Sequence, residues 1–235
     1  MSETQLRIAV LIPALNEEAT LPRVLADLPK ILVEEVVVVD NGSSDQTPTV
    51  ARTCGATVLY EPRRGYGWAC LTGIAYLKTK APDILVFLDG DYSDHPDELL
   101  AVVQPILTDG YDLVIGSRTK GEADHGALLP QARFGNALAT FLIRLLYGFR
   151  YSDLGPFRAI RFPALLKLGM TDRTYGWTVE MQIKAIRQGL RITEVPVRYR
   201  KRAGGTSKVS GTIRGTVLAG YKILWTVVRY ARESV

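Results

Sequence analysis

The sequence predicts an α/β protein with a mostly parallel central sheet flanked by helices. Short runs rich in Val, Ile and Leu alternate with segments of helical pattern through the first half of the chain. The run Ile84–Leu88 is apolar throughout, as is typical of a strand that is buried on both faces. Charged residues follow several of these runs, at the strand ends where open α/β sheets bind ligands. We therefore expect a ligand site at one edge of the sheet.

Composition is that of a soluble globular protein with a preference for anionic partners. The 235 residues are 47% hydrophobic and 23% charged, and the formal net charge is +5. This charge favours nucleotides, lipid phosphates or an anionic membrane surface, and no nucleic-acid partner is predicted. No uninterrupted apolar run reaches the roughly 18–20 residues of a membrane-spanning helix. With only two cysteines and no signal-type segment, we expect a reduced, cytoplasmic location.

Strands and helices are expected in strict alternation up to Gly116. Pro13 ends the first strand and Asn16 caps the helix after it, while Ser44 or Asp45 caps the second helix. The expected strands are Leu6–Ile12, Glu35–Val39, Ala56–Tyr60, Ile84–Leu88 and Asp112–Gly116, and the expected helices are Glu17–Leu28, Gln46–Cys54, Trp68–Lys78 and Asp97–Leu107.

The regular alternation ends after Arg118, where Thr119–Pro130 is a candidate mobile loop over the site. Later helices are expected at Gln131–Tyr147, Thr178–Gln188 and Ile213–Arg232, and later strands at Phe157–Arg161 and Ile192–Tyr199. We expect one domain over residues 1–210 and an appended amphipathic helix within residues 211–235. That helix either packs on the domain or lies at a membrane surface, because its apolar and basic residues fall largely on opposite faces.

Asp89 and Asp91 are candidate metal ligands, because two carboxylates at a strand end suit Mg²⁺ or Mn²⁺. Gly90 between them has no side chain, so a sugar could approach the backbone closely. The alternative is an ordinary Asp-Gly turn at the end of a strand. Right-handed crossovers would bring Asp40, the acid pair and Arg118 to one rim of the sheet, which favours the functional interpretation.

Five ordered motifs resemble family 2 glycosyltransferases, whose catalytic domain has the Rossmann-like GT-A fold. The motifs are Ile12–Glu17, Asp40–Asp45, the DXD motif Asp89–Asp91, Gly116–Arg118 and Gly205–Lys208. Over residues 6–210 the chain is most similar to the dolichyl-phosphate mannose synthase and polyprenyl-phosphate glycosyltransferase branch. The resemblance implies an inverting, metal-dependent enzyme that moves a hexose from a nucleotide sugar of the GDP-mannose or UDP-glucose type to a polyprenyl (dolichyl) phosphate.

The resemblance also implies roles for single residues. Asp91, Arg118 and Arg133 would be catalytic, and a Mg²⁺ or Mn²⁺ ion would be held by Asp89 and Asp91, with Ser93 as a third candidate. The donor base and ribose would contact Pro13, Leu15, Glu17, Val38 and Asp40, and the sugar would approach Gly90. The donor phosphates would contact Arg202 and Lys208. The acceptor phosphate would contact Arg118, Arg133 and Asn136. Many relatives carry an aromatic residue at the Leu15 position and alanine at the Gly90 position. Many also continue into transmembrane helices, whereas this sequence shows none. Contact with the cytoplasmic face of a membrane is therefore expected to be peripheral.

Three alternatives stay open. A lipid or glycan hydroxyl acceptor would need a carboxylate base, for which Glu180 and Asp153 are the candidates. Nucleotidyl transfer would place a glycine-rich basic loop after the first strand, where this chain has Pro13–Glu18. A non-catalytic binding module would have no need of both acids. The sequence leaves open the donor base, the sugar, the acceptor length and the oligomeric state.

Overall fold

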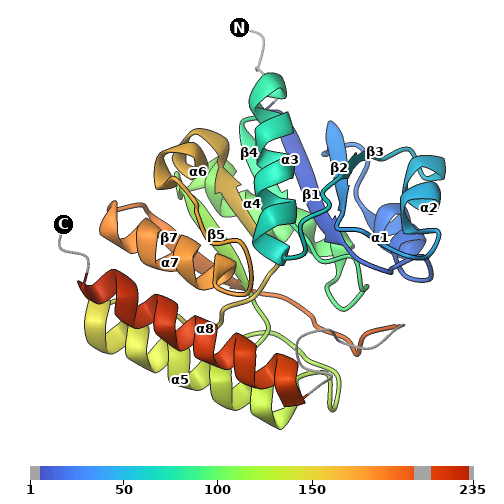
Figure 1. The fold of residues 1–235 in the computed structure, drawn as a ribbon. Helices are drawn as coiled ribbons and strands as arrows, with labels where there is room; N and C mark the ends of the chain where they lie inside the picture. Colours follow the sequence, from blue (N-terminus) through green and yellow to red (C-terminus); the bar gives the residue numbers. More distant parts are fainter. Residues whose placement is uncertain (1–5, 204–212, 233–235) are drawn as a thin grey trace, which may run out of the picture.

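A mostly parallel sheet forms the centre of the molecule and is covered by helices on both faces (Figure 1). The computed structural model describes residues 6–203 and 213–232. Within these ranges the sheet has seven strands in the order β3-β2-β1-β4-β6-β5-β7. The strands are β1 (Ile8–Ala14), β2 (Glu35–Asp40), β3 (Thr57–Tyr60), β4 (Ile84–Phe87), β5 (Leu113–Ser117), β6 (Arg158–Arg161) and β7 (Ile192–Pro196).

Helices divide between the two faces because side chains alternate along each strand. Leu11 of β1 packs on the face covered by α3 and α5 to α8, and Ile12 packs on the face covered by α1, α2 and α4. The helices are α1 (Leu21–Asp27), α2 (Thr47–Thr53), α3 (Tyr66–Lys80), α4 (Leu99–Thr108, preceded by a 3₁₀ turn at Pro96–Glu98), α5 (Pro130–Tyr147), α6 (Phe162–Leu168), α7 (Trp177–Arg187) and α8 (Ile213–Arg232).

Strand directions bring the predicted rim together. β1 pairs in parallel with β2 and β4, whereas β6 lies antiparallel between β4 and β5. β5 therefore runs in the same direction as β4, and the carboxyl ends of β1, β2, β4 and β5 meet at one edge. Asp40, Asp89 and Arg118 follow these strand ends, so their predicted convergence on one rim is confirmed.

Several local predictions were wrong. Pro13 does not end the first strand, since β1 continues to Ala14. Asn16 does not cap the first helix: it has a φ of 56°, and its side-chain oxygen accepts the N–H of Ser44, 2.8 Å away. It ties the loop after β1 to the loop after β2, and α1 begins only at Leu21. Helix α6 was not expected, because its 7 residues are too few to show a clear helical period.

Helix α8 lies beside α5 and also packs against α7 (Figure 1). Val227 and Tyr230 are buried in the core, and the hydroxyl of Tyr147 on α5 donates to the carbonyl of Val227 at 2.6 Å. Lys222, also on α8, forms an ion pair with Asp172 at 3.1 Å. Within the described ranges no helix is both long and apolar enough to cross a membrane.

The start of α3 approaches the backbone of residues 172–173 very closely. Gly65 has a φ of 147°, which disfavours any other residue. A Cβ added at Gly67 would lie 2.1 Å from the carbonyl oxygen of Asp172, so the backbone would have to move. The two glycines therefore set the position of Tyr66 between them.

Replacing Gly67 with alanine is expected to lower the unfolding temperature by about 5–10 °C, since the clash is with backbone rather than a flexible side chain. Gly135→Ala is the matched control, because Gly135 also lies in a helix but has nothing within 4 Å of the added Cβ. Thermal unfolding followed by circular dichroism checks both. Equal unfolding temperatures for the two variants would show that the contact with Asp172 is not rigid.

Candidate active site

A cavity of about 400 Å³ opens at the carboxyl edge of the sheet. Residues from the ends of β1 and β4, from the start of α3 and from the segment after β7 form its walls. Predicted site residues in its lining are Pro13, Leu15, Glu17, Asp89, Gly90, Asp91 and Arg202. This volume is large enough for a nucleotide-sized ligand.

Asp89 is the most strongly perturbed carboxyl group of this cavity. Its Oδ1 atom is buried and has no hydrogen-bond partner. Burial and then the charge of Asp91 raise the pKa of Asp89 to about 7, although a hydrogen bond with Tyr66 opposes this. A buried carboxylate oxygen without a donor is costly unless a cation binds it, so this atom fits a divalent ion.

Asp91 is held in place by its neighbours. The N–H and the hydroxyl of Ser93 both donate to its Oδ1 atom, at 3.0 and 2.5 Å, and Arg202 lies 3.3 Å from its Oδ2 atom. Ser93 thus orients Asp91 in this structure. Among the residues that the structure describes, no three His, Cys, Asp or Glu side chains form a metal cluster, so Asp89 and Asp91 are the residues that would hold an ion.

Asp94 is a further carboxyl group that the sequence did not single out. It is buried, and burial followed by the charges of Asp89 and Asp91 raises its pKa well above the usual range. The turn after β4 folds Asp94 back toward the acid pair. Arg118 is among the cations that oppose this rise.

Glu17 and Arg202 close one side of the cavity. Arg202 donates to Glu17, whose pKa is raised by burial in spite of the arginine. The hydroxyl of Thr20, the residue before α1, donates to the carbonyl of Gly90 at 2.8 Å and lies 3.0 Å from a carboxyl oxygen of Glu17, which links the start of α1 to the acid pair. Lys208, the second predicted phosphate contact, lies outside the described residues.

Two predicted donor contacts do not line the cavity. Val38 is wholly buried in the core on the α1 side, because it lies before the end of β2 and the alternation along the strand points its side chain at that face of the sheet. Asp40 is buried and its Oδ1 accepts the N–H of Ser43 at 3.0 Å, so it shapes the loop after β2. Asn41, Arg64, Tyr66, Thr174, Tyr175 and Tyr199 line the cavity and were not among the predicted site residues.

A second cavity of about 310 Å³ meets the first at Tyr66, Asp89, Thr174 and Tyr175. It runs between α5, α7 and α8 and has a largely apolar lining that includes Leu154, Trp177 and Ile223. The two cavities thus share Asp89, and a reaction between their occupants would take place there.

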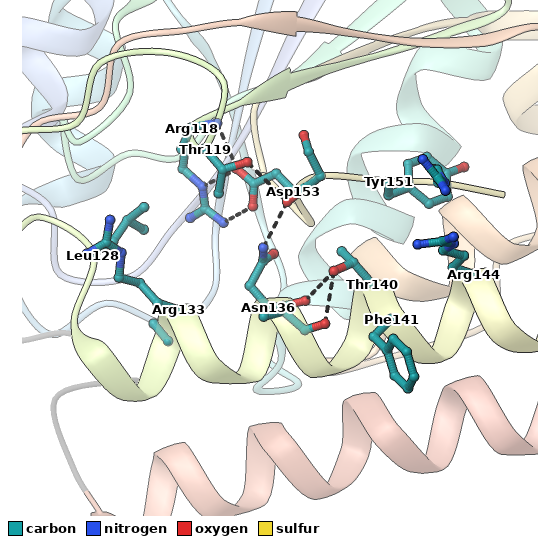
Figure 2. A pocket seen from close by; sticks show the side chains of 14 residues that line it. Arg118, Thr119, Leu128, Arg133, Asn136, Thr140, Phe141, Arg144, Tyr151 and Asp153 are labelled. Atoms are coloured by element: carbon teal, nitrogen blue, oxygen red, sulfur yellow. Dashed lines mark hydrogen bonds and ion pairs between the residues drawn. The ribbon is translucent and has the colours of Figure 1, made fainter.

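A third cavity of about 400 Å³ lies along α5 (Figure 2). Arg118 and Asn136 line both this cavity and the second one, whereas Arg133 lines only the third. Arg118 binds Asp153 through two bonds of 2.8 and 2.7 Å. Burial alone would lower the pKa of Arg118, but the bonds to Asp153 outweigh the effect of burial and raise this pKa. The predicted arginine pair therefore borders one cavity, next to the site of Asp89.

Both candidate bases are engaged elsewhere. Asp153 is buried against Arg118 and also accepts the N–H of Leu154. Glu180 is buried beneath α8, accepts hydrogen bonds from Thr171 and Tyr230, and pairs with Lys184 at 2.8 Å. Burial works against its ionisation, but these bonds lower the pKa of Glu180. Glu180 therefore stabilises the packing of α7 and α8 as a carboxylate.

The raised pKa of Asp89 predicts a pH-dependent stability in the absence of metal. The folded protein keeps the proton up to about pH 7 while the unfolded chain loses it near pH 4, so this group lowers stability as pH rises between the two values. Asp89→Asn removes the ionisation and is expected to unfold several degrees higher than the unsubstituted protein near pH 8 in EDTA, with a smaller difference near pH 4.

Thermal unfolding at both pH values measures this effect. Asp109→Asn, which alters an exposed carboxyl group at the end of α4, is the control and should show no such difference. A lower unfolding temperature for Asp89→Asn near pH 8 would contradict the uncompensated burial of this acid.

Comparison with known proteins agrees with this geometry. The profile of the family described as Glycosyl transferase family 2 matches residues 9–169. The chain is 39% identical over 212 residues to an uncharacterised glycosyltransferase of Mycobacterium tuberculosis, covering 90% of this chain and 94% of that protein. It is 37% identical over 205 residues to a dolichyl-phosphate hexose transferase of Haloferax volcanii, covering 85% of each.

A solved structure is similar over almost the whole chain. Glucosyl-3-phosphoglycerate synthase of M. tuberculosis, crystallised with Mn²⁺, uridine diphosphate and phosphoglyceric acid, has a TM-score of 0.75 and 25% identity, covering 97% of this chain and 80% of that one. The same enzyme has also been crystallised with Mg²⁺ and uridine diphosphate. The chain described here is thus a nucleotide-sugar-dependent enzyme of GT-A fold, and it belongs to glycosyltransferase family 2.

Proposed function

We propose that this enzyme transfers a hexose from a nucleoside diphosphate sugar to a polyprenyl phosphate, with inversion at the anomeric carbon. The observation that carries the proposal is Asp89, which lies where the nucleotide-sized cavity meets a largely apolar cavity bordered by Arg118. Two similar proteins are named for such acceptors: the hexose transferase above and an undecaprenyl-phosphate mannosyltransferase of Micrococcus luteus, 33% identical over 224 residues. These names support the dolichyl-phosphate mannose synthase branch.

The donor would lie in the first cavity with its diphosphate beside Asp89, Asp91 and Arg202. Gly90 lines the same cavity and has no side chain, so the sugar can approach the backbone between the two acids. A bound Mg²⁺ or Mn²⁺ would neutralise charge on the diphosphate leaving group. Arg202 lies 3.3 Å from Asp91 and can reach the same phosphates, where its guanidinium adds positive charge.

The acceptor phosphate would be bound by Arg118 and Arg133, and its isoprenoid chain by the apolar second cavity. A phosphate oxygen attacks the anomeric carbon, and the bond from that carbon to the donor diphosphate breaks, releasing the nucleoside diphosphate. The attacking oxygen is already anionic, so no general base is needed. This agrees with the engagement of Glu180 and Asp153 in other bonds. A hydroxyl acceptor would require one of those two carboxylates to be free.

The acceptor class is tested by incubating the protein with Mn²⁺ and a panel of GDP- and UDP-sugars. The acceptor arms are a polyprenyl phosphate, the matching polyprenol, and phosphoglyceric acid. Of the three acceptors, only the polyprenyl phosphate is expected to support turnover. Faster turnover with polyprenol or phosphoglyceric acid would contradict the proposal and favour a hydroxyl acceptor.

Arg133→Ala is expected to raise the KM for the polyprenyl phosphate by about tenfold or more, because a bond between a guanidinium and a phosphate is lost. The KM for the nucleotide sugar should stay within about twofold, since Arg133 does not line the donor cavity. Steady-state kinetics with each substrate varied in turn separates the two effects. An equal change in both values would place Arg133 outside the acceptor site.

We also propose that α5 and α8 hold the enzyme against the cytoplasmic face of a membrane. The two helices lie side by side (Figure 1), and each carries large apolar side chains in contact with solvent. These are Phe134, Phe141, Leu145 and Leu146 on α5, and Leu218, Tyr221, Trp225 and Val228 on α8. Lys222 and Arg229 lie over the ring of Trp225, at 4.6 and 5.1 Å, which is the chemistry of an interfacial helix.

The free thiols of Cys54 and Cys70 support a reduced compartment.

Trp225→Glu is expected to weaken binding to phosphatidylcholine vesicles by roughly tenfold or more, since an indole is replaced by a charge at the interface. Ile31→Glu is the matched control, because Ile31 is 85% exposed and lies between α1 and β2. Co-sedimentation with vesicles gives both affinities. If the control loses as much binding as Trp225→Glu, α8 has no special part in membrane contact.

A further inference from the structure

The cavity along α5 has two cationic ends, and the proposed reaction uses only one of them. Figure 2 shows Arg118 and Arg133 near Leu128 at one end and Arg144 beside Tyr151 at the other. Arg150, which directly precedes Tyr151, also lines the cavity. Asn136, Thr140 and Asp153 lie between the two ends (Figure 2). The second end therefore places two guanidinium groups away from Asp89.

The positive charge of this second end is not balanced by the protein. Within the described ranges, neither Arg144 nor Arg150 makes an ion pair or a side-chain hydrogen bond. Asp153, the carboxylate in the lining, is bound to Arg118 at 2.7 Å. Glu194, the acid that binds Ser152 nearby, pairs with Lys120 at 2.9 Å. Two unbalanced arginines in a cavity favour an anion that offers several oxygens.

Exposed apolar side chains lie at and near the same end. Phe141 lines the cavity and is 58% exposed, and Leu145, which is 68% exposed, lies on the same helix but outside the cavity lining. A soluble phosphate compound would gain nothing from these exposed groups. A lipid would gain from both features, because its phosphate meets the guanidinium groups while its acyl chains cover the apolar side chains.

We propose that the Arg144 and Arg150 end of this cavity binds the headgroup phosphate of an anionic phospholipid. The bound lipid fixes α5 against the bilayer, with the Arg118 and Arg133 end facing the acceptor phosphate in the same cavity. The proposal rests on the membrane contact proposed above and adds a specific lipid site to it. It assigns Arg144 and Arg150 no part in the transfer reaction.

The test compares binding to vesicles of phosphatidylcholine alone and of phosphatidylcholine with phosphatidylglycerol. Arg144→Gln/Arg150→Gln is expected to lose roughly tenfold or more of the affinity for vesicles with phosphatidylglycerol and to bind neutral vesicles like the unsubstituted protein. Arg23→Gln/Arg52→Gln is the matched control, since it removes the same charge from α1 and α2 and should change both affinities by less than about threefold.

Several results in the binding experiments would overturn the proposal. One is an equal loss in the control variant, which would show an effect of net charge alone. The second is full binding of Arg144→Gln/Arg150→Gln to vesicles with phosphatidylglycerol, or no binding of the unsubstituted protein to them. The third is a calorimetric signal for glycerol 3-phosphate that disappears in Arg144→Gln/Arg150→Gln, which would identify a site for a soluble phosphate.

A separate assay keeps this site distinct from the proposed reaction. Transfer to a short-chain polyprenyl phosphate in detergent should be the same for Arg144→Gln/Arg150→Gln and for the unsubstituted protein. A reduced rate in that assay would place the two arginines in the acceptor site, against the proposal. If the unsubstituted protein shows no transfer, the proposed reaction fails, and the vesicle experiment still decides the lipid site.

Discussion

The candidate site is organised around a carboxylate that the fold buries with one oxygen atom left without a hydrogen-bond partner. Asp89 follows a strand that is buried on both faces, and its Oδ1 atom has no donor. Asp91 lies two residues away and adds a second negative charge. The hydrogen bond with Tyr66 and the charges of Arg118 and Arg202 offset only part of the cost of burying Asp89, so its pKa stays raised. A divalent ion with a diphosphate would supply what the fold leaves out, which is a common relation between stability and function.

The two cavities of the candidate active site are arranged around Asp89. The nucleotide-sized cavity and the apolar cavity both end at Asp89, one reached from β1 and α3 and the other from α5, α7 and α8. Arg118 borders the second cavity and is fixed by Asp153. Donor and acceptor would thus approach each other from separate sides, each bound by its own set of charges. Rigid placement of this kind accounts for much of the rate that an enzyme can provide.

Residues at strand ends were predictable, because parallel pairing brings the carboxyl ends of strands to one edge. Asp89, Asp91 and Arg118 are in this class. Val38 does not line the cavity, since the side chain of a residue within a central strand packs against one face of the sheet, and the sequence motif does not show which face that is. Tyr66 and Asp94 were missed because each reaches the site through a turn whose shape depends on distant backbone, as with Gly67 against Asp172. Arg133 lines the cavity along α5 but not the second cavity. This separation also depends on how α8 packs on α5, which the sequence does not show.

The most direct measurement is a crystal structure with Mn²⁺ and a nucleoside diphosphate, with the metal located from its anomalous scattering. The account predicts one strong peak within coordinating distance of Asp89 or Asp91 and of the diphosphate, with the nucleoside in the cavity lined by Leu15 and Glu17. A nucleotide bound there with the metal away from both Asp89 and Asp91 would contradict it.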